Sequence, residues 1–153
     1  MNRRISRFVL AVFATVLLAT PVSAASPDWP DSIDTIVKEA RQGIPTVDMA
    51  GYLKVVQDPK GAMILDVREA KEFAAGHVSG AVNVPRGLLE FLIWKAVGYP
   101  DKVDLDRTIY VQCQAGGRAS LAARTLKTLG FKHPVVVLMN FADWEKAGNP
   151  VVR

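Results

Sequence analysis

The sequence predicts a single α/β domain in which a mainly parallel β-sheet is covered by helices on both faces. Short apolar runs alternate with helical patterns along the chain, which is typical of repeated strand and helix units. One stretch near the centre, residues 108–120, passes from an apolar run through two glycines into a helical pattern. Functional sites in parallel sheets form at the carboxyl ends of the strands, so this stretch is the first place to search for one.

The first 24 residues have the features of a secretory signal peptide. Arg3, Arg4 and Arg7 make the first residues basic, an apolar run covers residues 8–20, and small residues follow at Val22 and Ala24. The run is shorter than a typical membrane span, which needs about 20 apolar residues. We therefore expect export by the general secretory route, cleavage after Ala24 and a periplasmic or secreted protein. An uncleaved N-terminal anchor is the alternative.

Removal of this leader changes what the charge implies. The chain has 19 basic and 15 acidic residues, and loss of the three leader arginines leaves 16 against 15. The basic balance is therefore partly a property of the leader and gives no support for nucleic-acid binding. Cys113 is the only cysteine, so no internal disulfide can form. A lone thiol in an exported protein is either buried or chemically used.

Two helices are expected before the first buried strand. Apolar residues recur at helical spacing over residues 33–40, with Asp31 as the expected N-cap and Gly43 as the stop. Thr46 is expected to cap a second helix over residues 47–57. The first of these helices is amphipathic, and the sequence does not specify where it docks.

Four short apolar runs predict strands of the sheet. A type I turn over residues 58–61, with Pro second and Gly fourth, precedes the first of them. The runs are bounded by turn residues and rich in β-branched residues, as buried strands are. They cover residues 62–65, 82–84, 108–112 and 135–138.

The loop after the third run contains the most informative residues. Gly116 and Gly117 permit positive φ and let backbone amides turn inward, and a helical pattern from Ala119 ends at Gly130. Cys113 therefore lies where a strand ends and a group of N–H donors precedes a helix N-terminus. That geometry stabilises an anion, and a thiolate is an anion. The alternative interpretation is a small buried residue at a strand end.

Two arginines near this loop are candidates for binding an anionic substrate. Arg118 ends the loop, where a cation is unfavourable beside the positive end of the helix dipole, so its presence suggests a function for its fork of donors. Arg86, directly after Pro85, is the second candidate.

Two motifs resemble the signatures of the rhodanese-type sulfurtransferases. The active loop of that family has the pattern Cys-x-x-Gly-x-Arg, which this chain matches at Cys113, Gly116 and Arg118. Residues 64–69, Ile-Leu-Asp-Val-Arg-Glu, and the segments that follow them up to Pro85 resemble the second signature. The resemblance covers roughly residues 46–151 and implies a five-stranded, mainly parallel sheet. The expected division is a leader (1–24), a linker with a helix (25–45) and a rhodanese-like domain (46–153).

The resemblance also implies roles for individual residues. Cys113 is the expected nucleophile, which carries sulfur as a persulfide. Asp66 and Arg68 are expected to hold the loop in place, and Glu72 and His77 are assigned to the same supporting role. The expected substrate-binding residues are Gln114, Ala115, Gly116, Gly117 and Arg118, with Arg86 in addition.

The same resemblance implies the partners of the reaction. The expected donor is a small anionic sulfur compound such as thiosulfate, and the expected acceptor is cyanide, a small thiol or a protein thiol. No metal or organic cofactor is implied, and two histidines with one cysteine give no plausible zinc site. We expect no nucleic-acid partner and no membrane contact after the leader is removed.

Three other classes of function compete with sulfur transfer. A phosphatase or arsenate reductase of related fold typically has one more residue between Cys and Arg than the four found here. A binding module would keep the fold without turnover, although the intact cysteine argues against it. A redox-sensing thiol would form sulfenic acid or a mixed disulfide rather than a persulfide.

Two further stretches bear on the surroundings of the site. Residues 88–97 are apolar on nearly every side, which predicts either a well-buried helix or a partly exposed apolar rim near the site that docks a partner. Before Trp144, where the family usually has a Gly-Gly pair, this chain has Asn140 and Phe141. We expect a rearranged turn there, because Phe tolerates left-handed backbone poorly. Phe141 is also expected to reshape the mouth of the pocket.

Overall fold

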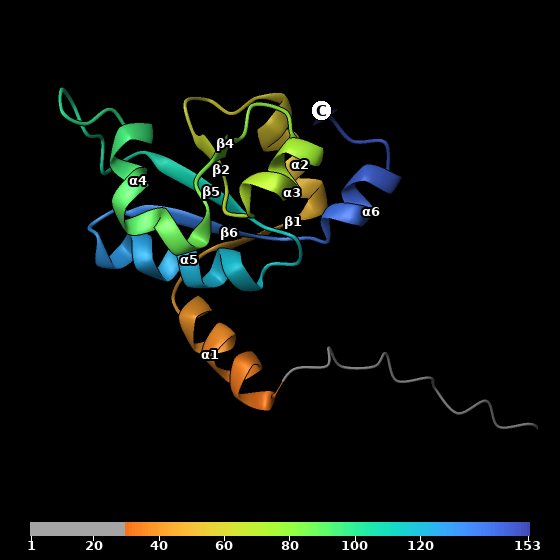
Figure 1. Ribbon diagram of the computed structural model, residues 1–153, viewed down its shortest axis with the longest axis horizontal. Helices are drawn as coiled ribbons and strands as arrows, with labels where there is room; N and C mark the ends of the chain where they lie inside the picture. The colour runs from red at the N-terminus through yellow and green to blue at the C-terminus, as the bar shows by residue number, and fades with distance from the viewer. Residues whose placement is uncertain (1–29) are drawn as a thin grey trace, which may run out of the picture.

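The computed structural model describes residues 30–153, and its centre is a five-stranded parallel sheet (Figure 1). Its strands are β1 (Thr46–Asp48), β2 (Met63–Asp66), β4 (Val82–Asn83), β5 (Thr108–Gln112) and β6 (His133–Leu138). Their order is β1-β6-β5-β2-β4, and each pair of neighbours is parallel. The predicted fold class is therefore confirmed. A small antiparallel pair joins β3 (His77–Val78) to β7 (Val151–Val152).

Helices cover both faces of the sheet, as expected for parallel strands joined by crossovers. They are α1 (Asp31–Arg41), α2 (Met49–Gln57), α3 (Ala70–Ala75), α4 (Leu89–Ala96), α5 (Gly117–Thr128) and α6 (Phe141–Lys146), with a short 3₁₀ helix η1 (Arg86–Leu88). Along β5, Ile109 and Val111 belong to the core under α4 and α5, whereas Tyr110 packs against the core under α2 and α6. This alternation is the period of a strand buried on both faces.

Helix α1 is the predicted amphipathic helix, and it packs on α5. Its first turns extend beyond the layers of the sheet (Figure 1). Asp31 is the first helical residue rather than the N-cap, which is Pro30. The predicted cap is thus wrong by one residue, although an acidic first turn still suits the helix dipole. Gly43 follows the helix with φ 70°, as expected for the stop.

Residues 46–57 differ from the single helix that was expected there. Thr46 begins the edge strand β1, which pairs with β6, and α2 begins only at Met49. Asp48 caps that helix in place of Thr46, because its Oδ1 accepts from the Gly51 N–H at 2.8 Å. A three-residue strand is too short to show a periodic pattern, so it could not be predicted from the sequence.

The turn before β2 is shifted by one residue from its predicted place. The Ala62 amide donates to the Pro59 carbonyl at 2.8 Å, so the turn spans residues 59–62. Lys60 and Gly61 at its centre have φ of 48° and 83°, as in a type I′ turn. The prediction of a type I turn over residues 58–61 is therefore wrong. Gly61 occupies the third position of the observed turn, where a positive φ costs a glycine little free energy.

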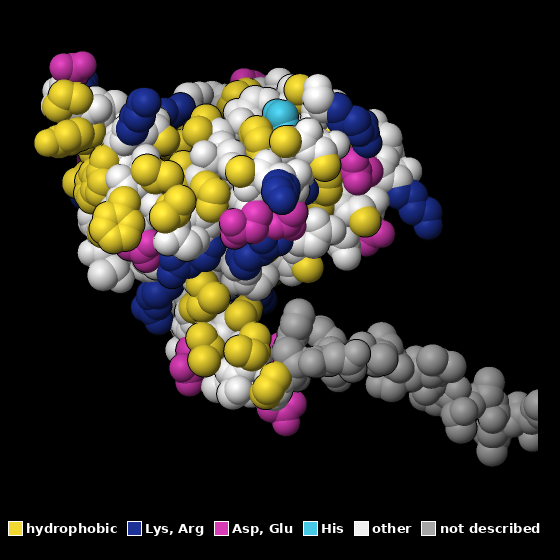
Figure 2. Space-filling view, viewed as in Figure 1, with side chains coloured by type: hydrophobic (Ala, Val, Ile, Leu, Met, Phe, Trp, Pro, Cys, Tyr) yellow, Lys and Arg dark blue, Asp and Glu magenta, His cyan; other side chains and the backbone are white. Residues whose placement is uncertain are grey.

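Helix α4 is buried on one side and apolar on the other. Leu89 and Ile93 are fully buried, whereas Phe91 is 77% exposed. Apolar side chains gather over this helix, at the left of Figure 2. Of the two alternatives for this stretch, the fully buried helix is therefore wrong and the apolar rim is exposed, while the docking of a partner there stays a prediction. Among residues 30–153, no helix combines the length and the apolar character needed to cross a bilayer. The predicted leader lies outside the described residues.

Candidate active site

Cys113 lies directly after β5, in the loop that leads into α5. Its side chain is buried, with 2% exposed. The Gly116 amide donates to Sγ at 3.2 Å, and the Ala119 amide donates to it at 3.4 Å. Ala119 belongs to the first turn of α5, where N–H groups have no partner within the helix. Backbone donors from both the loop and the helix start therefore meet at the sulfur.

The two loop glycines have different conformations. Gly116 has φ 87°, and a Cβ there would lie 3.2 Å from Leu138 Cδ2. A side chain at this position would be strained by the backbone and crowded by β6. Gly117 is the first residue of α5 and has no positive φ. The prediction of left-handed backbone is thus correct for Gly116 and wrong for Gly117.

Neighbouring segments hold the loop from outside. The Phe141 amide, at the start of α6, donates to the Gln114 carbonyl at 2.9 Å. The Ser120 hydroxyl, which is fully buried, donates to the Gly116 carbonyl at 2.8 Å. Gln114 is half-buried and Ala115 is exposed, so the middle of the loop is the part that a substrate can reach.

Asp66 and Arg68 form a buried ion pair behind the loop. Arg68 Nη2 lies 2.8 Å from Asp66 Oδ2, and both side chains are almost completely buried. The same carboxylate accepts from Gln112 Nε2 at 2.6 Å, and Gln112 directly precedes Cys113. Arg68 Nη2 also donates to the Gly76 carbonyl at 2.8 Å. These contacts fit a supporting role for the pair, because buried charges need partners of this kind.

Phe141 reaches the same cluster from α6. The Arg68 guanidinium lies 3.9 Å from the centre of the Phe141 ring, within the range of a cation–π contact. Asn140 has φ −95°, and its Oδ1 accepts from the Ala142 amide at 2.9 Å. Asn140 therefore caps α6 from extended backbone, which Phe141 follows without a left-handed turn.

Arg118 lies beside the loop, and its guanidinium forms an ion pair with Glu72 of α3. Nη1 lies 2.6 Å from Oε2 and Nη2 lies 2.8 Å from Oε1, which is a bidentate geometry. The hydrogen bond from Arg118 lowers the pKa of Glu72 to about 2, so this carboxylate is ionised at neutral pH. The bond to Glu72 raises the pKa of Arg118, and Cys113 adds a smaller electrostatic contribution in the same direction. Arg118 is therefore held beside the loop by its ion pair with Glu72.

Arg86 and His77 occupy other positions. Arg86 Nη2 donates to Thr125 Oγ1 at 3.0 Å. Thr125 comes seven residues after Arg118 on α5, about 10 Å along the helix, so the structure does not bring Arg86 to the loop. His77 stacks on Phe73 with ring centres 3.7 Å apart, which fits the structural role expected for it.

A hollow of about 250 Å³ opens beside the loop. Gln114 of the loop, α3 and α6 contribute to its walls, and Phe141 is part of the lining. The charged groups of the lining are paired, Arg68 with Asp66, Glu72 with Arg118, and Glu145 with Arg153. The walls of this hollow therefore combine the aromatic ring of Phe141 with charged side chains that are each held in an ion pair.

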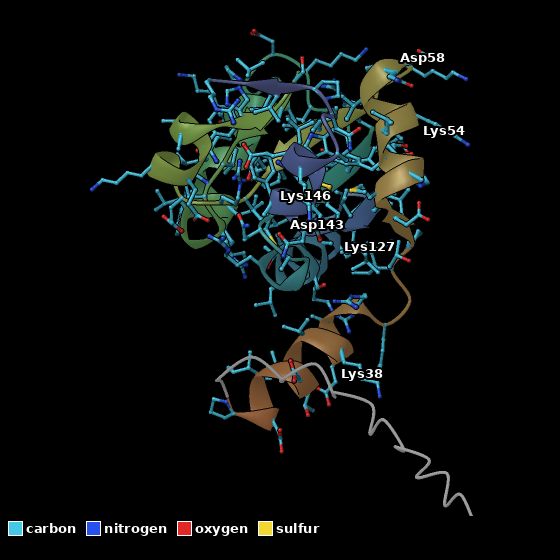
Figure 3. All side chains as sticks on the ribbon, turned by 90° about the vertical axis from the view of Figure 1, so that its right-hand side faces the viewer. Lys38, Lys54, Asp58, Lys127, Asp143 and Lys146 are labelled. Atoms are coloured by element: carbon cyan, nitrogen blue, oxygen red, sulfur yellow. The ribbon has the colours of Figure 1, made fainter. Side chains whose placement is uncertain are left out.

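A larger hollow, of about 660 Å³, lies near the amino-terminal end of β5, opposite the end that leads to Cys113. Lys54 and Asp58, which Figure 3 labels on α2 and just after it, are part of its lining, as is Thr108 at the amino end of β5. Cys113 follows the carboxyl end of the same strand. The length of β5 therefore separates the larger hollow from the nucleophile.

Sequence reasoning missed three of the residues that hold the loop. Ser120 gives no signal beyond its place two residues after Arg118. Gln112 has the sequence features of an ordinary strand end, and the contact of the Phe141 amide with the loop leaves no trace in a side-chain pattern. Gln112 and Phe141 act through tertiary contacts, and the local bond of Ser120 to the carbonyl four residues before it depends on a loop conformation that only the fold reveals.

Comparison with known proteins gives a family and several relatives. The model of the Rhodanese-like domain family matches residues 49–147. The putative sulfur carrier protein YrkF of Bacillus subtilis is 31% identical over 106 residues, which cover 69% of this chain and 54% of YrkF. Thiosulfate sulfurtransferase GlpE of Shewanella oneidensis is 30% identical over 90 residues, which cover 59% of this chain and 82% of GlpE. The chain thus spans about half the length of the Bacillus relative.

Solved structures give the same result for the fold. The polysulfide-sulfur transferase homodimer from Wolinella succinogenes matches with a TM-score of 0.64 and 26% identity. The match covers 80% of this chain and 88% of that one. The sheet and the helices around it are therefore shared with a known sulfur-transferring protein.

Proposed function

Because this chain belongs to the rhodanese-like domain family, we propose that it is an exported sulfurtransferase that carries sulfur as a persulfide on Cys113. One observation carries the proposal. The amides of Gly116 and Ala119 donate to Sγ of a buried cysteine that is the only one in the chain. Donors fixed in this way stabilise negative charge on the sulfur. The sulfurtransferases among the relatives support the same chemistry.

The proposed reaction consists of two displacements on sulfur. The Cys113 thiolate attacks the outer sulfur of thiosulfate or a similar donor. A new S–S bond forms, the S–S bond of the donor breaks, and sulfite leaves with the electron pair. Cyanide, a small thiol or a protein thiol then attacks the terminal sulfur of the persulfide, and the Cys113 thiolate is restored. Covalent catalysis thus divides one difficult transfer into two easier steps without an external oxidant.

In this proposal, residues 114–117 and Arg118 bind the sulfur donor. Ala115, in the middle of the loop, is exposed, so backbone amides there can donate hydrogen bonds to an anion. Arg118 supplies positive charge, which an anionic donor would share with Glu72. Arg86 has no part in the proposal, because its guanidinium contacts Thr125 instead.

The test is the activity of Cys113→Ser with thiosulfate and cyanide, measured as thiocyanate formed. The variant should fold normally, with the same circular dichroism and nearly the same melting temperature, because the substitution changes one buried atom. It should have no activity, because the chain has no second cysteine to carry sulfur. Residual turnover in Cys113→Ser would disprove the persulfide route, as would a wild type that turns over no sulfur donor.

A further inference from the structure

Helix α1 precedes the residues that match the family model, yet it contacts the start of α5, directly after the active loop. The model matches residues 49–147, whereas α1 ends at Arg41. A Cβ placed on Gly117 would lie 3.9 Å from Val37 Cγ2 of α1. The helix thus packs against the start of α5, where the Cys113 loop ends (Figure 1).

A continuous path of hydrogen bonds leads from α1 to the sulfur. Arg41 Nε–H donates to Ser120 Oγ at 3.0 Å. The Ser120 hydroxyl donates to the Gly116 carbonyl at 2.8 Å. The Gly116 N–H then donates to Cys113 Sγ at 3.2 Å. In each of the three bonds, the donor is the group nearer to Arg41 along this path and the acceptor is the group nearer to the sulfur.

We propose that Arg41 is a positioning residue, which acts through Ser120 to hold Gly116 in the conformation that aims its N–H at Cys113. The left-handed backbone of Gly116, with φ 87°, is accessible to glycine, but glycine does not select it over other conformations. An external restraint is therefore needed to keep the N–H on the sulfur. The Gly116 carbonyl is where that restraint acts, because it accepts from the Ser120 N–H at 3.0 Å and from the Ser120 hydroxyl at 2.8 Å, and Arg41 acts on the second of these bonds.

The arginine adds to this restraint by its charge and by its position. A hydroxyl has one proton and two lone pairs, so the Arg41 donor occupies a lone pair and leaves the proton for Gly116. A charged donor also polarises the hydroxyl and strengthens the bond that follows it in the chain. Ser120 is fully buried, so water does not compete for the bond from its hydroxyl to Gly116.

The chain offers two matched controls. Arg124 Nη2 donates to the Glu39 carbonyl at 3.2 Å, so it also joins α1 to α5, but its contact is away from the loop. Lys38 is exposed on α1, below the body of the domain in Figure 3. Arg124→Ala therefore tests the docking of α1 alone, and Lys38→Ala tests the loss of a positive charge alone.

The experiment is the rate of Cys113 alkylation by iodoacetamide across a range of pH, with the full chain. Arg41→Ala and Ser120→Ala should each slow alkylation at neutral pH by roughly 3- to 10-fold, the effect of one lost hydrogen bond. Both should shift the pH profile upward. The double variant should be no slower than Ser120→Ala, because the two residues act in series. Arg41→Lys, which keeps a flexible cationic donor at this position, should recover part of the rate.

Three outcomes would overturn the inference. They are unchanged alkylation in Arg41→Ala, equal slowing in Arg124→Ala or Lys38→Ala, and additive effects in the double variant. Ser120→Ala removes a single oxygen, so it keeps the proposal testable if Arg41→Ala weakens the docking of α1. The inference rests on the proposed function for the use of the thiol, but alkylation requires no sulfur transfer. An inactive wild type would therefore disprove the function and leave this contact to be judged separately.

Discussion

At the scale of single residues, the site depends on backbone donors aimed at one sulfur atom. Gly116 and Ala119 supply these donors, and the left-handed backbone of Gly116 excludes other side chains at its position. Arg118 adds charge, but Glu72 accepts from both of its terminal nitrogens. An anionic donor molecule must therefore compete with this carboxylate or bind to the face of Arg118 that it leaves open.

Arg118→Ala tests whether the guanidinium binds the donor. If it does, the KM for thiosulfate should rise by roughly 10- to 150-fold, because a hydrogen bond to a charged group contributes about 1.5–3 kcal/mol. Steady-state kinetics measures the effect. Glu72→Gln is the control, since it frees the guanidinium and should not raise KM. Unchanged kinetics in Arg118→Ala would restrict this residue to its ion pair.

At the scale of the elements, the Glu72–Arg118 pair connects α3 to the start of α5. Glu72 also accepts from the Glu69 amide at 3.0 Å, so one carboxylate caps α3 and anchors the helix that follows the loop. Both side chains of the pair are about one third exposed. Ion pairs of this exposure contribute little to stability at neutral pH, but their contribution depends on pH.

The pH dependence follows from the pKa of Glu72, which is lowered from 4.5 to about 2 by Arg118. A lowered pKa means that the folded state favours the carboxylate, so its contribution is present above about pH 4.5 and is lost as the pH falls toward 2. The free energy of unfolding of Glu72→Gln should therefore fall less steeply over this range than that of wild type. Urea unfolding at a series of pH values measures the slope. Glu39→Gln, which removes an exposed carboxylate from α1, should keep the wild-type slope, and an equal slope in Glu72→Gln would contradict the account.

How much of these elements the sequence could predict depended on their length. The apolar run over residues 108–112 is long enough to show its character, and β5 occupies those residues. Strand β1 has three residues and one apolar side chain, so no period exists to detect. The motif residues Cys113, Gly116 and Arg118 could be found because they lie together in the chain. The contact between Arg41 and Ser120, which are 79 residues apart, could not.

At the scale of the whole molecule, the sheet places the loop at its carboxyl edge and the N-terminal helix beside it. Helix α1 begins at Asp31, so cleavage after Ala24 would leave six residues before it. The helix and its contact with the loop would then persist in the mature protein. The outer face of α4, with Phe91 and Leu92 exposed, remains the predicted docking rim.

Export is tested by N-terminal sequencing of protein recovered from the cell envelope. The features of residues 1–24 predict a mature chain that starts at Ala25 and lies in the soluble part of that fraction. A chain that starts at Met1 and sediments with the membranes would show a retained anchor instead.

The persulfide on Cys113 is the central claim, and the intact mass of the purified protein tests it most directly. After incubation with thiosulfate, the mass should increase by one sulfur atom, and addition of cyanide should remove that atom as thiocyanate. Cys113→Ser, treated in the same way, should keep its original mass. A wild-type protein that folds normally and gains no sulfur from thiosulfate or any other sulfur donor would contradict the account.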